Sequence, residues 1–275
     1  MLKRLQELHW LNLDVAAGAG LCAAAASRLP DGAGPVNRMA IVVLMLTVWV
    51  IYTADRLLDV RKKPVPSTPR HRFHLANAGW LWKLTAGVAA LAGGLALTLP
   101  AGLLRSGGIL AGIVAAYLLL VNRLGPKSKL HLFKEPLTAL VYTAGVWGVA
   151  FSGKEAIAWE EKAQAGIFLL IAFQNLLLFS WMETRAGKPP VPNLSSILRE
   201  GFSDVLFGLC LAGIVGLFLA ISFTELVPYQ RRFAFTQVLM SLVLVEIRRD
   251  YRFYLKNERY RWVGDGIFLL PFWLF

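Results

Sequence analysis

Two aspartates in the first quarter of the chain are spaced for metal chemistry. Asp55 and Asp59 stand four residues apart in the segment YTADRLLDVRKK, so on a helix they lie on one face, one turn apart. Two carboxylates at this spacing can hold a hard cation such as Mg²⁺, which prefers oxygen ligands and keeps some of its water. Basic residues follow at once, namely Arg61, Lys62, Lys63, Arg70 and Arg72. Carboxylates, a divalent cation and adjacent Arg and Lys side chains together predict a site for a diphosphate.

The same residues allow an interpretation without chemistry. Asp55 can simply pair with Arg56 or with a neighbouring helix, while the basic run marks the cytoplasmic flank of a membrane span. Asp55 directly follows a long apolar run, where a carboxylate is costly unless it is paired or used. The residues alone leave both interpretations open.

The elements that position these aspartates are predicted to be membrane helices. Of the 275 residues, 56% are hydrophobic and 17% are charged, whereas soluble domains are usually about 25% charged. Apolar runs of about 18 residues or more recur along the chain, which indicates membrane-spanning helices. We therefore expect one all-α domain over residues 1–275, a polytopic bundle of about nine transmembrane helices, over 10–29, 36–54, 77–99, 104–122, 135–152, 164–182, 203–223, 232–247 and 262–275.

The net charge of +12 indicates an orientation for such a bundle. With the N-terminus in the cytoplasm, the large majority of the Lys and Arg residues fall in cytoplasmic segments, as the positive-inside rule requires. This distribution explains the basic charge without a nucleic-acid partner, so none is expected. The N-terminal segment MLKRLQELHW shows no cleavable signal pattern. A protein of the bacterial inner membrane fits these features.

The layout resembles that of a known family. About nine spans with DRxxD at the end of the second resemble the UbiA family of intramembrane prenyltransferases, which carry NDxxDxxxD at this place, followed by a basic RTxxRP segment. Asp55, Arg56 and Asp59 match the second half of the motif, and STPRHR, residues 67–72, is similar to the basic tail.

Two further segments carry the resemblance. NRLGPKSKLHLFKEP, after the fourth span, is similar to the basic YSxxLKR segment of the family, and QNLLLFSWMETRAG, after the sixth, stands where the family has a second DxxxD. Glu183, four residues before Gly187, matches the last acid of that second motif. The chain departs from the family at three acidic or amide positions, which are occupied here by Ile51, Tyr52 and Phe179.

The resemblance implies a function and a set of site residues. The expected reaction is the Mg²⁺-dependent transfer of an isoprenyl group from its diphosphate to a lipophilic acceptor, expected to be aromatic, inside the bilayer. Asp55, Asp59 and Glu183 would be the catalytic residues and metal ligands. The implied diphosphate ligands are Arg56, Arg61, Arg70, Arg72, Arg123, Lys127 and Lys134, and the implied chamber residues are Tyr52, Tyr142 and Asn175. A UbiA-like terpene cyclase or diphosphate lyase and a degenerate, non-catalytic membrane protein remain alternatives that the sequence does not separate.

Overall fold

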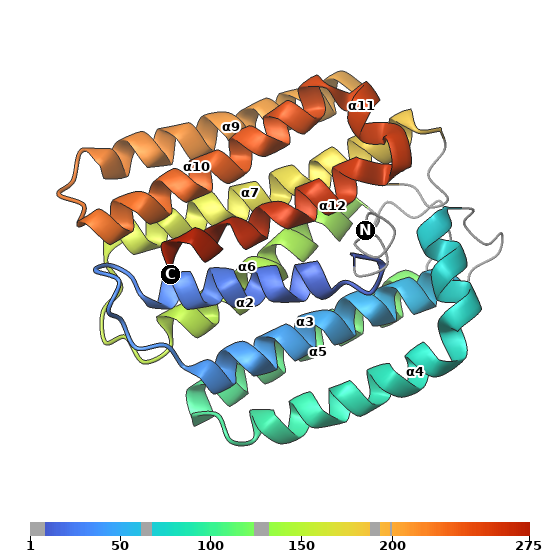
Figure 1. Cartoon of the computed structure of the whole chain (residues 1–275), viewed down its shortest axis with the longest axis horizontal. Coiled ribbons are helices and arrows are strands. Elements are labelled where there is room, and N and C mark those ends of the chain that lie inside the picture. The colour runs from blue at the N-terminus through green and yellow to red at the C-terminus, as the bar shows by residue number, and fades with distance from the viewer. Residues whose placement is uncertain (1–8, 62–67, 124–131, 188–192, 199) are drawn as a thin grey trace.

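The chain folds into a bundle of helices, seen in Figure 1. The computed structural model describes residues 9–61, 68–123, 132–187, 193–198 and 200–275, and within these ranges no residue lies in a strand. The all-α prediction is thereby confirmed. The long helices of the first part are α2 (Leu13–Ser27), α3 (Arg38–Asp59), α4 (Pro69–Ala96), α5 (Ala101–Arg123) and α6 (Lys134–Phe151).

The second part of the chain completes the bundle with long and short helices. They are α7 (Trp159–Arg185), α8 (Leu194–Ile197), α9 (Glu200–Ser222), α10 (Pro228–Arg249), α11 (Tyr251–Leu255) and α12 (Arg259–Gly266). Two 3-10 helices, η2 (Lys256–Glu258) and η3 (Ile267–Leu274), flank α12. Pro271 lies inside η3, where it cannot donate a backbone hydrogen bond.

Four of these helices are long and apolar enough to cross a membrane, namely α3, α5, α7 and α9. A chain with this property is consistent with an integral membrane protein. Each span expected from the sequence overlaps a helical element, the first being α2 and the last being α12 with η3. The boundaries differ most around the second and third expected spans, because α3 continues to Asp59 and α4 already begins at Pro69.

Small residues allow α2 to lie in the middle of the bundle, against α3, α6 and η3. A Cβ atom added at Gly18 would come within 2.8 Å of Phe268, and one added at Gly20 within 2.5 Å of Met45. Small side chains at helix interfaces let neighbouring backbones approach closely, which is how membrane helices gain packing energy. On the other side of the core, α7 has the most buried apolar window of the four membrane-type helices.

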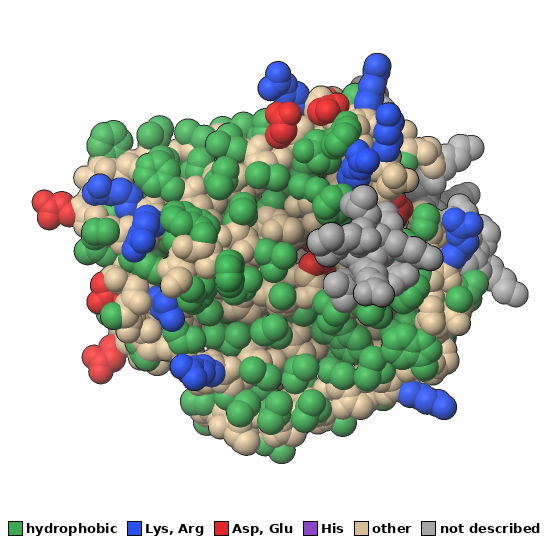
Figure 2. Space-filling view, in the orientation of Figure 1, with side chains coloured by type: hydrophobic (Ala, Val, Ile, Leu, Met, Phe, Trp, Pro, Cys, Tyr) green, Lys and Arg blue, Asp and Glu red, His purple; other side chains and the backbone are tan. Residues whose placement is uncertain are grey.

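One end of the bundle collects the segments that matter for the site. The C-terminal ends of α3, α5, α7 and α10 lie at this end, together with the N-terminal ends of α4, α6, α9 and α12 (Figure 1). We call it the basic end, because it carries many of the described basic residues: Arg56, Arg61, Arg70, Arg72, Lys134, Arg185, Arg248, Arg249, Arg252, Lys256, Arg259 and Arg261. Figure 2 shows hydrophobic side chains over much of the long face between the two ends.

Candidate functional site

A long cavity runs through the bundle between α3, α4, α5 and α6. Its volume is about 1220 Å³, and along α3 it is lined from Ala40 to Asp59, a stretch that measures about 28 Å at the rise of an α-helix. Most of its wall consists of aliphatic residues and glycines, including Leu44, Gly107 and Gly148. Polar and charged residues line its mouth at the basic end. The cavity therefore suits an elongated apolar molecule with a charged head.

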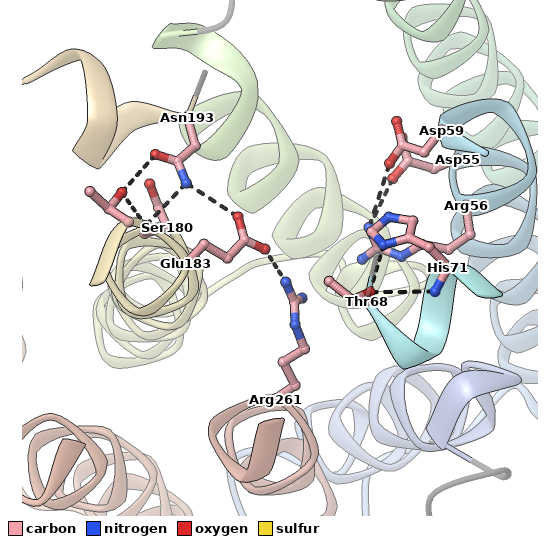
Figure 3. Close-up of polar contacts among 10 residues, drawn as sticks. Asp55, Arg56, Asp59, Thr68, His71, Ser180, Glu183, Asn193 and Arg261 are labelled. Atoms are coloured by element: carbon pink, nitrogen blue, oxygen red, sulfur yellow. Dashed lines mark hydrogen bonds and ion pairs between the residues drawn. The ribbon is translucent and has the colours of Figure 1, made fainter. Parts of the chain in front are cut away.

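The last turns of α3 carry the two aspartates into this mouth. Asp55 and Asp59 both line the cavity, with side chains 26% and 16% exposed. Arg56 lies with them, its Nη1 atom 3.5 Å from Asp55 Oδ2 and 3.9 Å from Asp59 Oδ2 (Figure 3). Both distances exceed those of strong charge-assisted hydrogen bonds, so Arg56 contributes to the charge balance of the carboxylates without a short ion pair to either one.

Lys134 opens α6 beside the same aspartates. The Asp55 carboxylate, helped by Asp59, raises the pKa of the Lys134 ammonium above its ordinary value in spite of burial. Such a shift means that the ammonium and the two carboxylates share one electrostatic environment. Lys134 also lines the cavity, so it adds a cation to the mouth.

The start of α4 brings two more basic side chains into the mouth. Thr68 is the N-cap of α4, its hydroxyl accepting from the backbone N–H of His71 at 3.4 Å, and Pro69 occupies the first turn. The capped start fixes Arg70 and His71 on the cavity wall, where they are only 5% and 6% exposed. Burial, reinforced by the charges of Arg70, Arg56 and Arg261, lowers the pKa of His71 to about 3, so this imidazole is neutral at physiological pH.

Arg70 is a buried cation without a carboxylate partner in the described part of the chain. Within the described ranges it forms no ion pair, and its Nε atom has no hydrogen-bond partner. Burial, together with the charges of Arg261 and Arg56, lowers the pKa of Arg70 to about 9. A guanidinium rarely releases its proton. Binding an anion therefore stabilises this buried charge more readily than loss of the proton would. The mouth is thus electrostatically prepared for a negatively charged group.

Glu183 lies across the mouth in a separate cluster, as Figure 3 shows. One carboxylate oxygen accepts a hydrogen bond from Arg261, and the other accepts from Asn193 Nδ2 at 3.2 Å. Asn193 also donates to the Ser180 carbonyl at 3.0 Å. Arg261 is 6% exposed in its side chain, so the glutamate provides the counter-charge for a buried guanidinium.

The acids of the mouth differ in how well they fit a metal ion. Within the described ranges, Asp55, Asp59 and Glu183 do not form a group whose oxygen atoms lie within 4.8 Å of one another. The Asp55–Asp59 pair, which faces an open polar cavity, fits one hard cation that completes its shell with water or phosphate oxygens. Glu183 is engaged by Arg261 and Asn193, so its first role is to hold Arg261 at the mouth.

The remaining residues implied by the resemblance divide into three groups. Tyr52 and Tyr142 line the long cavity, whereas Asn175 lines a small neighbouring cavity of about 50 Å³. Arg61 and Arg72 are exposed and do not line the long cavity. The side chain of Arg123 and the whole of Lys127, both predicted diphosphate ligands, lie outside what the structure describes.

The structure adds mouth residues that the sequence motifs did not identify. Arg261, His71, Asn193, Glu135 and Tyr117 all line the cavity. Glu135 is buried, and its Oε1 atom accepts from the Leu194 backbone N–H at 3.1 Å, which ties α6 to the segment after α7. Glu135 directly follows Lys134. Its position beside a basic segment was therefore the only feature of the sequence that could have indicated a role for Glu135 at the mouth.

The Glu183–Arg261 pair yields a prediction about stability. We expect Glu183→Gln to lower the free energy of unfolding by about 3 kcal/mol, because it leaves Arg261 buried without its counter-charge. Glu246→Gln is the matched control. Glu246 pairs with Arg249, but the two side chains are 55% and 81% exposed, and exposed pairs contribute about 0.5 kcal/mol or less. Thermal unfolding of both variants in detergent tests this difference, and equal losses would contradict a structural role for the pair.

These features define a class of protein: an all-helical chain with membrane-type helices around a long apolar cavity, whose mouth combines two aspartates with buried cations. Comparisons of the chain with models of protein families, with curated proteins and with solved structures found no match.

Proposed function

We propose that the chain is an integral membrane prenyltransferase that moves an isoprenyl group from its diphosphate to a lipophilic, aromatic acceptor with the help of Mg²⁺. The observation that carries the proposal is Arg70, a buried guanidinium that has no ion-pair partner among the described residues and lines the same long apolar cavity as Asp55 and Asp59. The mouth suits a diphosphate, and the apolar length of the cavity suits the hydrocarbon chain attached to it.

The proposal includes a topology. The helical elements cross the bilayer about nine times in a UbiA-like arrangement, and the N-terminus and the basic end face the cytoplasm. This orientation follows the positive-inside rule, since the basic end carries many of the described Lys and Arg residues. It opens the charged mouth to the compartment that supplies water-soluble diphosphate groups. A bacterial inner membrane suits this arrangement.

In the proposed reaction, the bond between the allylic carbon and the diphosphate oxygen breaks, and its electron pair leaves with the diphosphate. A Mg²⁺ ion held by Asp55 and Asp59 would supply Lewis-acid stabilisation of the leaving oxygens. Arg70 and Lys134 bind the same group through charge-assisted hydrogen bonds, which gain strength as negative charge accumulates on it. Arg56 balances the carboxylates when the diphosphate has left.

The apolar part of the cavity serves the second half of the reaction. The allylic cation is attacked by an electron pair of the acceptor, and the acceptor then gives up a proton to the released diphosphate, which restores its ring. Aliphatic walls keep water from competing for the cation. Tyr52 and Tyr142 line this region and offer aromatic faces that attract a cation.

The first experiment measures turnover of radiolabelled geranyl, farnesyl and geranylgeranyl diphosphates by the protein in membranes, with and without Mg²⁺ and crude lipid acceptors. We expect diphosphate release that requires Mg²⁺ and a prenylated product that appears only with acceptor. A hydrocarbon product without acceptor would instead identify a terpene cyclase or diphosphate lyase. No release from folded protein with any donor would favour the degenerate, non-catalytic alternative.

The length of the cavity yields a prediction about the donor. Gly93 and Gly94 are neighbours on α4, and a Cβ atom at either position meets no atom within 4 Å, but only Gly93 lines the cavity. We expect Gly93→Leu to lower kcat/KM for the longest accepted donor by about 10-fold, because the added side chain projects into its path, a loss comparable to one or two misplaced methylene groups. Gly94→Leu is the control and should change little. Equal behaviour of the two variants with every donor would contradict a chain bound along this wall.

A further inference from the structure

A second polar cluster lies inside the bundle, where the N-terminal segment meets α12. One ring nitrogen of His9 and one carboxylate oxygen from each of Asp14 and Asp265 lie within 4.8 Å of one another. His9 precedes α2, Asp14 lies in the first turn of α2, and Asp265 lies near the end of α12. Residues more than 250 positions apart are thereby brought to one point.

The charges of this cluster are incompletely balanced. His9 Nδ1 lies 2.6 Å from Asp14 Oδ2, so the imidazole can serve one of the two carboxylates. Within the described ranges Asp265 forms no ion pair, and its Oδ1 atom accepts a hydrogen bond from Asn175 Nδ2 at 3.3 Å. Two carboxylates this close repel one another, and the repulsion is strong in a medium of low dielectric constant. A bound divalent cation would neutralise both.

Two buried polar atoms beside the carboxylates have no partner. His9 is 9% exposed, and its Nε2 atom makes no hydrogen bond in the described structure; Asn175 is 3% exposed, and the same holds for its Oδ1 atom. Buried polar groups are nearly always satisfied, so such atoms indicate an absent ligand, water or ion. A small cavity of about 50 Å³ beside the cluster is lined by Asn175, Asp265 and Arg56, though not by His9 or Asp14, and it has room for a water that completes the shell of an ion held by the cluster.

The donor set selects the kind of cation. Imidazole ligands suit first-row transition metals and zinc, whereas Mg²⁺ and Ca²⁺ prefer oxygen atoms alone. One imidazole and two carboxylates are therefore a ligand set for Mn²⁺, Zn²⁺ or a similar ion, and a divalent charge leaves the site neutral.

We propose that His9, Asp14 and Asp265 form a binding site for one first-row divalent metal ion, such as Mn²⁺ or Zn²⁺, which joins the N-terminal segment and α2 to α12. The site is separate from the Asp55–Asp59 mouth and does not depend on the proposed prenyl transfer. Asn175 supports it from α7 through its hydrogen bond to Asp265. Since α12 also carries Arg261 and α2 packs against α3, the ion would stabilise the bundle around the mouth.

The test first removes the two mouth carboxylates, so that any metal ion bound by the variant must be held by other residues. The background variant is Asp55→Asn with Asp59→Asn, purified in detergent, stripped with a chelator and titrated with Mn²⁺ under electron paramagnetic resonance. We expect one Mn²⁺ per chain, displaced by Zn²⁺, and a rise in Tm of about 5 °C at a hundredfold excess over Kd. Adding Asp265→Asn or His9→Gln should weaken Kd at least about 10-fold and remove the rise in Tm.

The controls separate this site from adventitious binding. Asp31→Asn in the same background changes an exposed acid and should leave both Kd and the rise in Tm unaltered. Binding that is equally strong after Asp265→Asn would overturn the proposal, as would a stripped, monodisperse background protein that takes up neither Mn²⁺ nor Zn²⁺. In the second case a proton or a histidinium would be the counter-charge of the cluster.

Discussion

Changing Asp55 to Asn is expected to lower kcat/KM for Mg²⁺-dependent diphosphate release by about 10²- to 10³-fold, and changing Asp59 to Asn to have a similar effect. The two carboxylates lie one turn apart on α3 and line the cavity mouth. An amide keeps the size of the side chain but removes the negative charge that holds a hard cation. Turnover in membranes, measured over a range of Mg²⁺ concentrations, should show a raised Mg²⁺ requirement along with the lower rate.

Asp250→Asn is the matched control for these variants. Asp250 is exposed after the last turn of α10 at the basic end, and it does not line the cavity. The Asp250→Asn substitution removes the same charge from the same end of the bundle. The activity of this variant should therefore stay within about twofold of the wild type. If the Asp55 and Asp59 variants kept full activity, the aspartates would serve only as counter-charges for Arg56 and Lys134, and the proposed metal role would be wrong.

Some of the fold was predictable because hydrophobic patterning is a local property of the sequence. The apolar runs indicated where helices would lie, and the all-α class followed from them. The second membrane span was expected to end at residue 54, where hydropathy falls, whereas the helix that contains it continues to Asp59, as the one-face spacing of Asp55 and Asp59 requires. The start of α4 was also placed too late, since Thr68 and Pro69 form a helix start within a segment that resembled a basic tail.

The site was predictable only where its residues are neighbours in sequence. The spacing of Asp55 and Asp59 on one helix face is a local fact, whereas the Glu183–Arg261 pair joins residues from α7 and α12. The basic motif likewise does not indicate which of its arginines is buried. Arg70 and Arg72 look alike in STPRHR, and only the capped first turn of α4 decides that Arg70 lines the cavity and Arg72 is exposed.

That difference between two arginines gives the most discriminating prediction about the mouth. We expect Arg70→Met to lower kcat/KM for the diphosphate donor by about 10²-fold or more, because the variant loses the one described cation of the mouth that is both buried and without a carboxylate partner. Methionine keeps much of the buried volume, so the fold should be retained. Arg72→Met, two residues further on the same helix, should stay within about twofold of the wild type.

Arg70→Lys separates charge from geometry. A lysine keeps the positive charge but lacks the planar fork that binds two phosphate oxygens at once, so its kcat/KM should fall between the wild type and Arg70→Met. Binding of inorganic diphosphate, measured by calorimetry on the purified variants, should follow the same order. The anion relieves the unfavourable proximity of Arg70 to Arg56 and Arg261, so wild-type Tm should rise with diphosphate and Arg70→Met should show a smaller rise. Equal activity and equal diphosphate binding in Arg70→Met and Arg72→Met would mean that the buried guanidinium serves packing alone, and that the anion enters elsewhere.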